Sequence, residues 1–199
     1  MSRIFLIAVS AAVTLWAGTV LAQDASTTPV MAPTLAPAKG GATLAVTSNA
    51  FRNGAIFPEM YTQNGQNISP PLSWTRGPSG TKSYVVLTED SGVSRPQPVF
   101  HWVLYDVPAN VTSLPQALPT DAKLAEPAGA MNGLNIRKAS GYMGPKPPAG
   151  QTHPYHFEVF SLDTMLALDP STADRNAVVD AMKGHVLAEG EIVGMYTGK

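Results

Sequence analysis

The sequence predicts a mainly β protein, a β-sandwich with peripheral helices. Short apolar runs are separated throughout by turn residues, and the 199 residues include 17 Gly and 18 Pro, which favours turns and strands over a helical bundle. Apolar residues make up 44% of the chain, enough for a sizeable core in one domain. Only one segment, near the C-terminus, has the spacing of an amphipathic helix.

Residues 1–22 have the pattern of a secretory signal peptide. Arg3 gives a short basic start, residues 4–20 are apolar, and small residues end the segment before Gln23. The apolar run approaches the length of a membrane span, so a retained anchor is the alternative. We expect cleavage, hence no stable membrane span and a periplasmic or secreted protein. The chain has no Cys, which excludes disulfides and thiol chemistry.

Residues 23–40 are rich in Ala, Thr and Pro and lack apolar periodicity. This composition is typical of a flexible tether, with an ordered edge strand as the alternative. The globular domain is therefore expected to cover residues 41–199. The formal net charge of the whole chain is −1, without blocks of like charge, so nothing favours binding to nucleic acid or to an anionic membrane.

Strands are predicted in order along this domain. Residues 43–47 are strand-like, and residues 84–88 form an apolar run typical of a central strand buried on both faces. Residues 101–107 are similar and stop before a proline. Residues 110–133 contain several prolines and are expected to be irregular. In residues 155–162 apolar side chains alternate between two faces, as in a strand.

The helix is predicted after residue 171. Ser171 or Thr172 is expected to cap it, with Asp174 in its first turn, where the helix dipole favours an acid. Its buried stripe consists of Val178, Val179, Met182 and Val186. Gly190 is expected to end the helix, and residues 191–197 are predicted to form the last strand.

Polar side chains gather at the ends of three predicted strands. Asp90 follows the first of them, and His101 opens the second. His153 and Tyr155 open the third after a loop dense in Gly and Pro. These two are two residues apart, so they point the same way from a strand. A stiff, open loop beside such a pair is typical of a pocket wall.

Four motifs give this pattern a family resemblance. They are NISPPLSW at 67–74, Glu89-Asp90, His101-Trp102-Val103, and GPKPPAG at 144–150 followed by His153 and Tyr155. In this order they resemble the phosphatidylethanolamine-binding protein (PEBP) family, in its bacterial Raf-kinase-inhibitor-like (YbhB/YbcL) branch. The resemblance runs from about residue 41 to the C-terminus. It implies a large sheet packed on a smaller one, and a pocket that takes anions without a required metal.

The chain departs from the family pattern at two positions. The family usually has Asp-Pro-Asp-Ala-Pro where this chain has DSGVS at 90–94, so Gly92 replaces a second acid. The family usually has His-Arg-Tyr where this chain has His153-Pro154-Tyr155. One acid and one base are absent together, and we hypothesise that they form a coupled pair whose joint loss keeps the local charge balanced. These departures affect which ligand is expected, but not the expectation that the chain has the pocket.

We interpret the site as a ligand-binding pocket without catalytic residues, metal or cofactor. Its predicted residues are Asp90, His101, Gly144, Pro148, His153 and Tyr155. The ligand would be a small phosphate-type anion or a phospholipid head group. His101 and His153 would donate to its oxygens and Tyr155 would add a hydroxyl donor. Asp90 would hold a His in its tautomer, and Gly144 and Pro148 would shape the wall.

Two other functions remain open at this stage. Asp90, His101 and His153 have the side chains of a two-histidine, one-carboxylate metal site, so a metal-dependent enzyme or a hydrolase is one alternative. An inhibitor that docks a protease or kinase on the pocket rim is the other, with that protein as its partner. Taken singly, His101 also fits a buried core residue and Asp90 an ordinary turn residue.

Overall fold

The computed structural model describes residues 28–199. The predicted signal peptide, residues 1–22, and the first part of the predicted tether, residues 23–27, lie outside the described residues. Within residues 28–199, none of the helices combines the length and the apolar character that crossing a bilayer requires.

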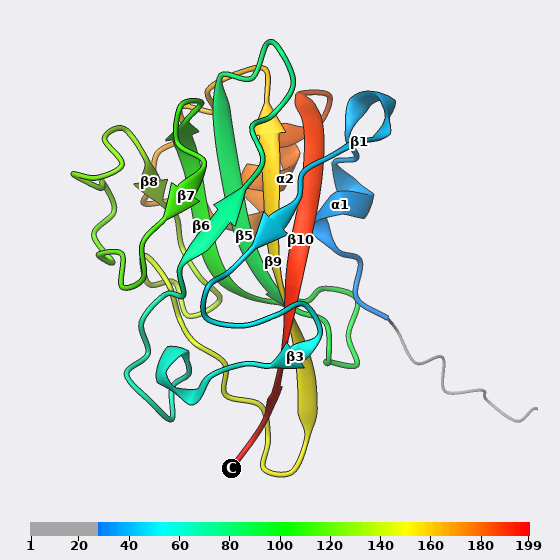
Figure 1. Cartoon of the computed structure of the whole chain (residues 1–199), viewed down its shortest axis with the longest axis vertical. Helices are drawn as coiled ribbons and strands as arrows, with labels where there is room; N and C mark the ends of the chain where they lie inside the picture. Colours follow the sequence, from blue (N-terminus) through cyan, green and yellow to red (C-terminus); the bar gives the residue numbers. More distant parts are fainter. Residues whose placement is uncertain (1–27) are drawn as a thin grey trace, which may run out of the picture.

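Two sheets are packed face to face, with the smaller one in front of the larger one in Figure 1. The larger sheet has the order β1 (Ala42–Thr43), β10 (Val186–Thr197), β9 (Thr152–Leu162), β5 (Ser83–Asp90), β6 (Val99–Pro108) and β8 (Met131–Asn132), with β3 (Ala55–Ile56) also paired to β10. The smaller sheet is β2 (Val46–Thr47), β4 (Leu72–Trp74) and β7 (Ser113–Leu114). This arrangement confirms the predicted fold class.

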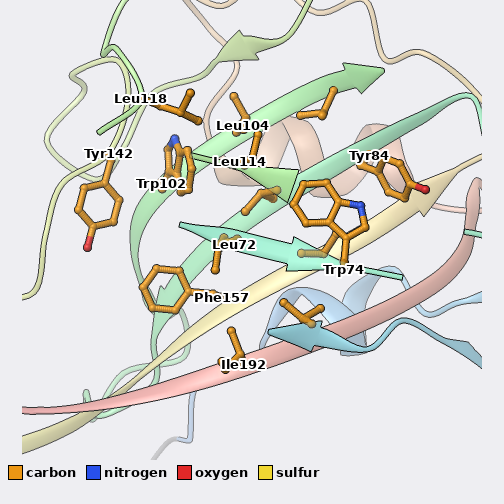
Figure 2. Close-up of a cluster of buried hydrophobic side chains, with 14 of the residues drawn as sticks. Leu72, Trp74, Tyr84, Trp102, Leu104, Leu114, Leu118, Tyr142, Phe157 and Ile192 are labelled. Carbon is orange, nitrogen blue, oxygen red and sulfur yellow. The ribbon is translucent and has the colours of Figure 1, made fainter. Parts of the chain in front are cut away.

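The strands of the larger sheet separate two apolar clusters. Tyr84 and Val86 of β5 face the smaller sheet, whereas Val85 and Leu87 face the other side, because successive side chains of a strand alternate. Figure 2 shows the first cluster, in which Leu72 and Trp74 of β4 lie over side chains of the larger sheet. Every residue of β5 is buried, as the continuous apolar run predicted.

Helices cover the second face. α2 (Arg175–Met182) lies behind the larger sheet in Figure 1, and the shorter α1 (Ala32–Leu35) precedes the first strand. Two single 3-10 turns, η1 (Lys39–Gly41) and η2 (Glu59–Tyr61), complete the helical segments described.

The cap and the end of α2 differ from the prediction. Asp174, and not Ser171 or Thr172, is the N-cap, and its side chain accepts from the backbone N–H groups of Asn176 and Ala177. The helix ends at Met182, because Gly184 takes a positive φ of 75° and turns the chain into β10. The last strand therefore begins at Val186, before the predicted start.

Residues 28–40 are packed on the domain, which differs from the flexible tether that their composition predicted. Ala32 and Ala36 are at most 1% exposed and belong to the cluster beneath α2. The N–H of Val30 donates to the carbonyl of Pro96 at 3.0 Å. Small side chains and backbone hydrogen bonds make these contacts, so the segment needs no apolar periodicity.

A buried ion pair joins this segment to α2. Arg175 donates through Nε to a carboxylate oxygen of Glu89, the residue before the end of β5, and both side chains are almost fully buried. The N–H of Ala32 donates to the other oxygen of Glu89 at 3.1 Å, and Nη2 of Arg175 donates to the carbonyl of Val30 at 2.8 Å. The N-terminal segment therefore completes the hydrogen bonding of both charges.

We expect Arg175→Met to lower the free energy of unfolding by about 3–5 kcal/mol, because it leaves the buried charge of Glu89 without its partner. Urea denaturation measures this change. Lys138→Met is the control, since Lys138 forms an exposed pair with Asp174 at the start of the same helix, worth about 0–1 kcal/mol. Equal losses in the two variants would show that the buried pair has no special role.

Candidate functional site

A pocket of about 250 Å³ opens where three strands of the larger sheet meet. β5 is antiparallel to both β6 and β9, so its end lies beside their beginnings, and Asp90 pairs with Val99 on one side and with Tyr155 on the other. The lining residues are Gln63, Asp90, Val93, Val99, His101, Ile136, Arg137, Met143, Lys146, Pro147, Pro148, His153 and Tyr155.

Most of the predicted site residues lie together in this pocket. Asp90, His101, Pro148, His153 and Tyr155 all line it. Gly144 does not. Its N–H donates to Oδ1 of Asn67 at 2.7 Å, and a Cβ there would meet the carbonyl oxygen of Tyr61 at 2.4 Å. Gly144 therefore allows two backbone segments to pack closely behind the pocket wall.

Asp90 and His153 form a buried pair. Nδ1 of His153 lies 2.9 and 3.0 Å from the two carboxylate oxygens of Asp90, and the N–H of Gly92 donates to Oδ1 of Asp90 at 2.8 Å. The carboxylate accepts, so the proton of His153 is on Nδ1. Nε2 of the same ring lies 3.3 Å from Oε1 of Gln151. The contact expected between Asp90 and a histidine is thus made with His153.

Gly92 is required by the position of this histidine ring. A Cβ at residue 92 would lie 2.5 Å from Cγ and 2.8 Å from Nδ1 of His153. Any larger residue would push the ring away from Asp90. Gly92 is therefore coupled to the contact between Asp90 and His153.

His101 has its own fixed tautomer. Nδ1 lies 2.8 Å from the carbonyl oxygen of Met143, and because a carbonyl only accepts, Nδ1 carries a proton. Burial lowers the pKa of His101, while the Met143 carbonyl and the charge of Asp90 oppose that shift. The ring is therefore neutral near pH 7, and Nε2, which is buried and has no partner among the described residues, is an acceptor. The expectation that His101 donates to the ligand holds only for the protonated ring.

Tyr155 lies beside His101 in the pocket. The two rings meet edge to face with centroids 5.2 Å apart. The hydroxyl is buried close to the carboxylate of Asp90. Burial and the nearby charge of Asp90 raise the pKa of Tyr155, so the phenol stays protonated and is available as a donor.

Arg137 is a pocket residue that sequence reasoning missed. It is exposed at the rim with Lys146, and its positive charge adds to the lowering of the His101 pKa. The N–H of the preceding residue, Ile136, donates to the carbonyl of Phe100 at 3.0 Å, which fixes this loop beside the start of β6. No local signal in the sequence indicates that contact.

The pocket does not assemble the metal ligands of the enzyme alternative. In the part of the chain that the structure describes, no group of three or more His, Cys, Asp or Glu side chains is arranged to hold a metal ion. Nδ1 of His153 and Nδ1 of His101 are each engaged by a protein acceptor. The combination of Asp90, His101 and His153 therefore gives no support to a metal-dependent reaction.

Comparison with known proteins agrees with the motifs and the fold. Residues 47–197 match the model of the phosphatidylethanolamine-binding protein family. The chain belongs to this family. The resemblance inferred from the sequence motifs is thereby confirmed.

Relatives are found in archaea and bacteria. A UPF0098 protein of Methanothermobacter thermautotrophicus is 39% identical over 150 residues, covering 75% of this chain and 95% of the relative. The crystal structure of Escherichia coli YbcL has a TM-score of 0.73 and 31% identity, covering 79% of this chain and all of YbcL. The structure of CT736 from Chlamydia trachomatis, a putative PEBP homologue, gives a TM-score of 0.69 and 31% identity, covering 79% of this chain and 99% of CT736.

We expect Gly92→Ala to destabilise the protein by about 1–3 kcal/mol, because the added methyl group overlaps the ring of His153. Chemical denaturation of the single variants and of the double variant with His153→Ala measures the coupling. In the His153→Ala background, which lacks the ring, Gly92→Ala should destabilise the protein much less. The steric explanation fails if Gly92→Ala costs as much in the His153→Ala background as in the natural one.

Proposed function

We propose that the protein binds a small phosphate-type anion, either phosphate or the phosphate of a head group, in this pocket. The observation that supports the proposal is Nε2 of His101, a buried atom on the pocket lining that has no hydrogen-bond partner among residues 28–199, with the buried hydroxyl of Tyr155 also on the lining. Leaving buried polar groups unpaired costs free energy, which a ligand that pairs them recovers.

The charge around the pocket suits an anion. Arg137 and Lys146 are exposed at the rim, and both are cations. The carboxylate of Asp90 is already occupied by His153 and by the N–H of Gly92. The rim therefore attracts phosphate oxygens, and the buried acid is compensated by groups of the protein itself.

One proton is expected between the ligand and His101. A neutral His101 offers Nε2 as an acceptor, which suits the hydroxyl of a singly protonated phosphate monoester, whose second pKa is about 6. A protonated His101 instead donates to an ionised phosphate oxygen. In either case binding takes up one proton, if the starting state is a neutral His101 and a fully ionised phosphate.

Binding fits the lining better than catalysis does. The side chains described around the pocket include no Ser, Thr or Cys, so a hydrolase would have no hydroxyl or thiol nucleophile in it other than the phenol of Tyr155. We therefore keep the binding function as the proposal. A protein partner that docks on the exposed rim residues Lys146 and Pro148 would use the same surface.

We expect the affinity for phosphoethanolamine to rise as the pH falls from 8 to 5. The pKa of His101 is lowered, so its protonation, and with it the gain in affinity, continues below pH 6.5. Titration calorimetry at fixed ionic strength measures this dependence. Glycerophosphoethanolamine, a phosphodiester without a titrating hydroxyl, separates the two sources of the proton, because any gain in its binding at low pH must come from a protein group.

His101→Gln should weaken binding about tenfold to a hundredfold at pH 5 and flatten the response to the diester, since glutamine cannot be protonated. Tyr155→Phe is the matched control. It removes a donor without changing the titration, so it should weaken binding at every pH. Val159→Ala, a core change, should lower stability and leave the affinity unchanged. Unchanged pH dependence in His101→Gln would refute the role of this ring.

We also propose that the protein acts outside the cytoplasm, because residues 1–22 have the pattern of a signal peptide. The protein purified from a periplasmic or secreted fraction should begin at Gln23. N-terminal sequencing or intact mass measurement tests this. Recovery of the chain with its first residues intact from the cytoplasm would contradict export, and recovery from the membrane would favour the anchor.

A further inference from the structure

A serine, a histidine and a glutamate form a chain of hydrogen bonds outside the anion pocket. Oγ of Ser91 lies 2.9 Å from Nε2 of His156, and Nδ1 of His156 lies 2.8 Å from Oε2 of Glu191. Ser91 directly follows β5, whereas His156 belongs to β9 and Glu191 to β10, and these three strands are neighbours in the larger sheet. None of the three side chains lines the anion pocket.

The direction of these hydrogen bonds follows from the groups involved. A carboxylate oxygen only accepts, so Nδ1 of His156 carries the proton that faces Glu191. Nε2 of the neutral ring is then an acceptor, and the hydroxyl of Ser91 donates to it. A serine that donates to a histidine held by a carboxylate is the arrangement of a Ser-His-acid triad, which is recognised by geometry and roles and not by order in the chain.

His156 differs in this respect from the other histidines. All four histidines lie in the part of the chain that the structure describes, and His156 alone joins a hydroxyl to a carboxylate. His185 also has a carboxylate partner, Asp163, at 2.7 Å, but it is exposed and contacts no serine. The His156 side chain is 19% exposed and Ser91 is half-buried, so a substrate can reach both from solvent.

A cavity of about 370 Å³ adjoins this group, between β9, β10 and the segment that carries α1. Figure 1 shows α1 beside β10 at this place. His156 and Glu191 line the cavity, and Met31 and Pro33 of the N-terminal segment provide apolar contacts. Further acidic side chains, among them Glu189, belong to the same lining, so an acyl group with a negative charge is disfavoured. The cavity therefore suits a short, uncharged acyl group.

We propose that Ser91, His156 and Glu191 hydrolyse small, uncharged carboxylic esters, an activity separate from the proposed anion binding. Oγ of Ser91 forms a bond to the ester carbonyl carbon, while Nε2 of His156 takes the hydroxyl proton. The bond from this carbon to the alcohol oxygen then breaks, and His156 returns the proton to the leaving alcohol. Water repeats the two steps on the acyl-serine, which releases the carboxylic acid and restores Ser91.

Two other groups support this reaction. The N–H of Ser91 makes only a long contact of 3.4 Å with the carbonyl of Pro154, so it can donate instead to the oxyanion that forms on the attacked carbonyl. Glu191 acts through His156, whose tautomer and orientation it holds, and is therefore a positioning residue.

Reaction with a fluorophosphonate tests the nucleophile on the protein without any mutation. An activated serine displaces fluoride and forms a bond from Oγ to phosphorus, which peptide mapping by tandem mass spectrometry locates. We expect the label on Ser91, together with steady release of p-nitrophenolate from p-nitrophenyl acetate. Absence of label at Ser91, or cleavage of the ester no faster than in buffer alone, overturns the proposal.

Variants of the two catalytic residues test the same activity. Ser91→Ala should abolish labelling and turnover, and His156→Gln should lower kcat by about a hundredfold or more, the usual contribution of a general base. Ser94→Ala removes an exposed serine of the same loop, and His185→Gln removes a histidine that lacks a serine partner. Both of these controls should keep full activity. Full activity in Ser91→Ala would show that the ester is cleaved elsewhere and overturns the assignment.

Glu191→Gln tests the positioning residue. We expect kcat to fall by about tenfold or more and KM to change little, because the substitution keeps the size of the side chain and disturbs the histidine. Glu126→Gln, at an exposed position, is the matched control and should change neither constant. An unchanged kcat in Glu191→Gln would overturn the role of Glu191.

Discussion

The pairing of β5 with strands on both of its sides is the constraint on which the anion pocket and the buried Glu89–Arg175 pair depend. β5 is fully buried and antiparallel to β6 and β9, so its last two residues lie where three strands meet. Successive side chains of a strand point to opposite faces. Asp90 therefore faces the anion pocket, and Glu89 faces the side covered by α1 and α2.

Each of these two adjacent acids is neutralised by a different part of the chain. Asp90 is held by His153 from the next strand and by the N–H of Gly92. Glu89 is held by Arg175 and by the N–H of Ala32. Buried charges must be paired, so the ends of β5, β9 and α2 and the N-terminal segment depend on one another. A shift of β5 by one residue would exchange the two acids and leave both unpaired.

The features that depend on local residue patterns were predicted correctly from the sequence. The apolar run of β5, the alternation of β9 and the order of the family motifs predicted the sheet and brought Asp90, His101, His153 and Tyr155 to one pocket. The packed segment before β1 was mispredicted, because alanines and backbone hydrogen bonds leave no periodic signal. Asp174 was placed in the first turn of the helix that it caps, since the two hydroxyl residues before it are equally good capping candidates.

What could not be predicted depends on distances between segments far apart in the sequence. The tautomer of His101 follows from the Met143 carbonyl, and the rim position of Arg137 from a contact of its loop with β6. Neither of these contacts can be inferred from the residue types.

Gly92 connects the departure from the family pattern to the proposed ligand. In this structure a side chain at residue 92 would overlap the ring of His153, so a second acid there is incompatible with the observed position of that ring against Asp90. The remaining carboxylate, that of Asp90, already accepts hydrogen bonds from His153 and from the N–H of Gly92. No free carboxylate among the described lining residues is then left for the amine of a head group. The proposed ligand is therefore held by its phosphate alone.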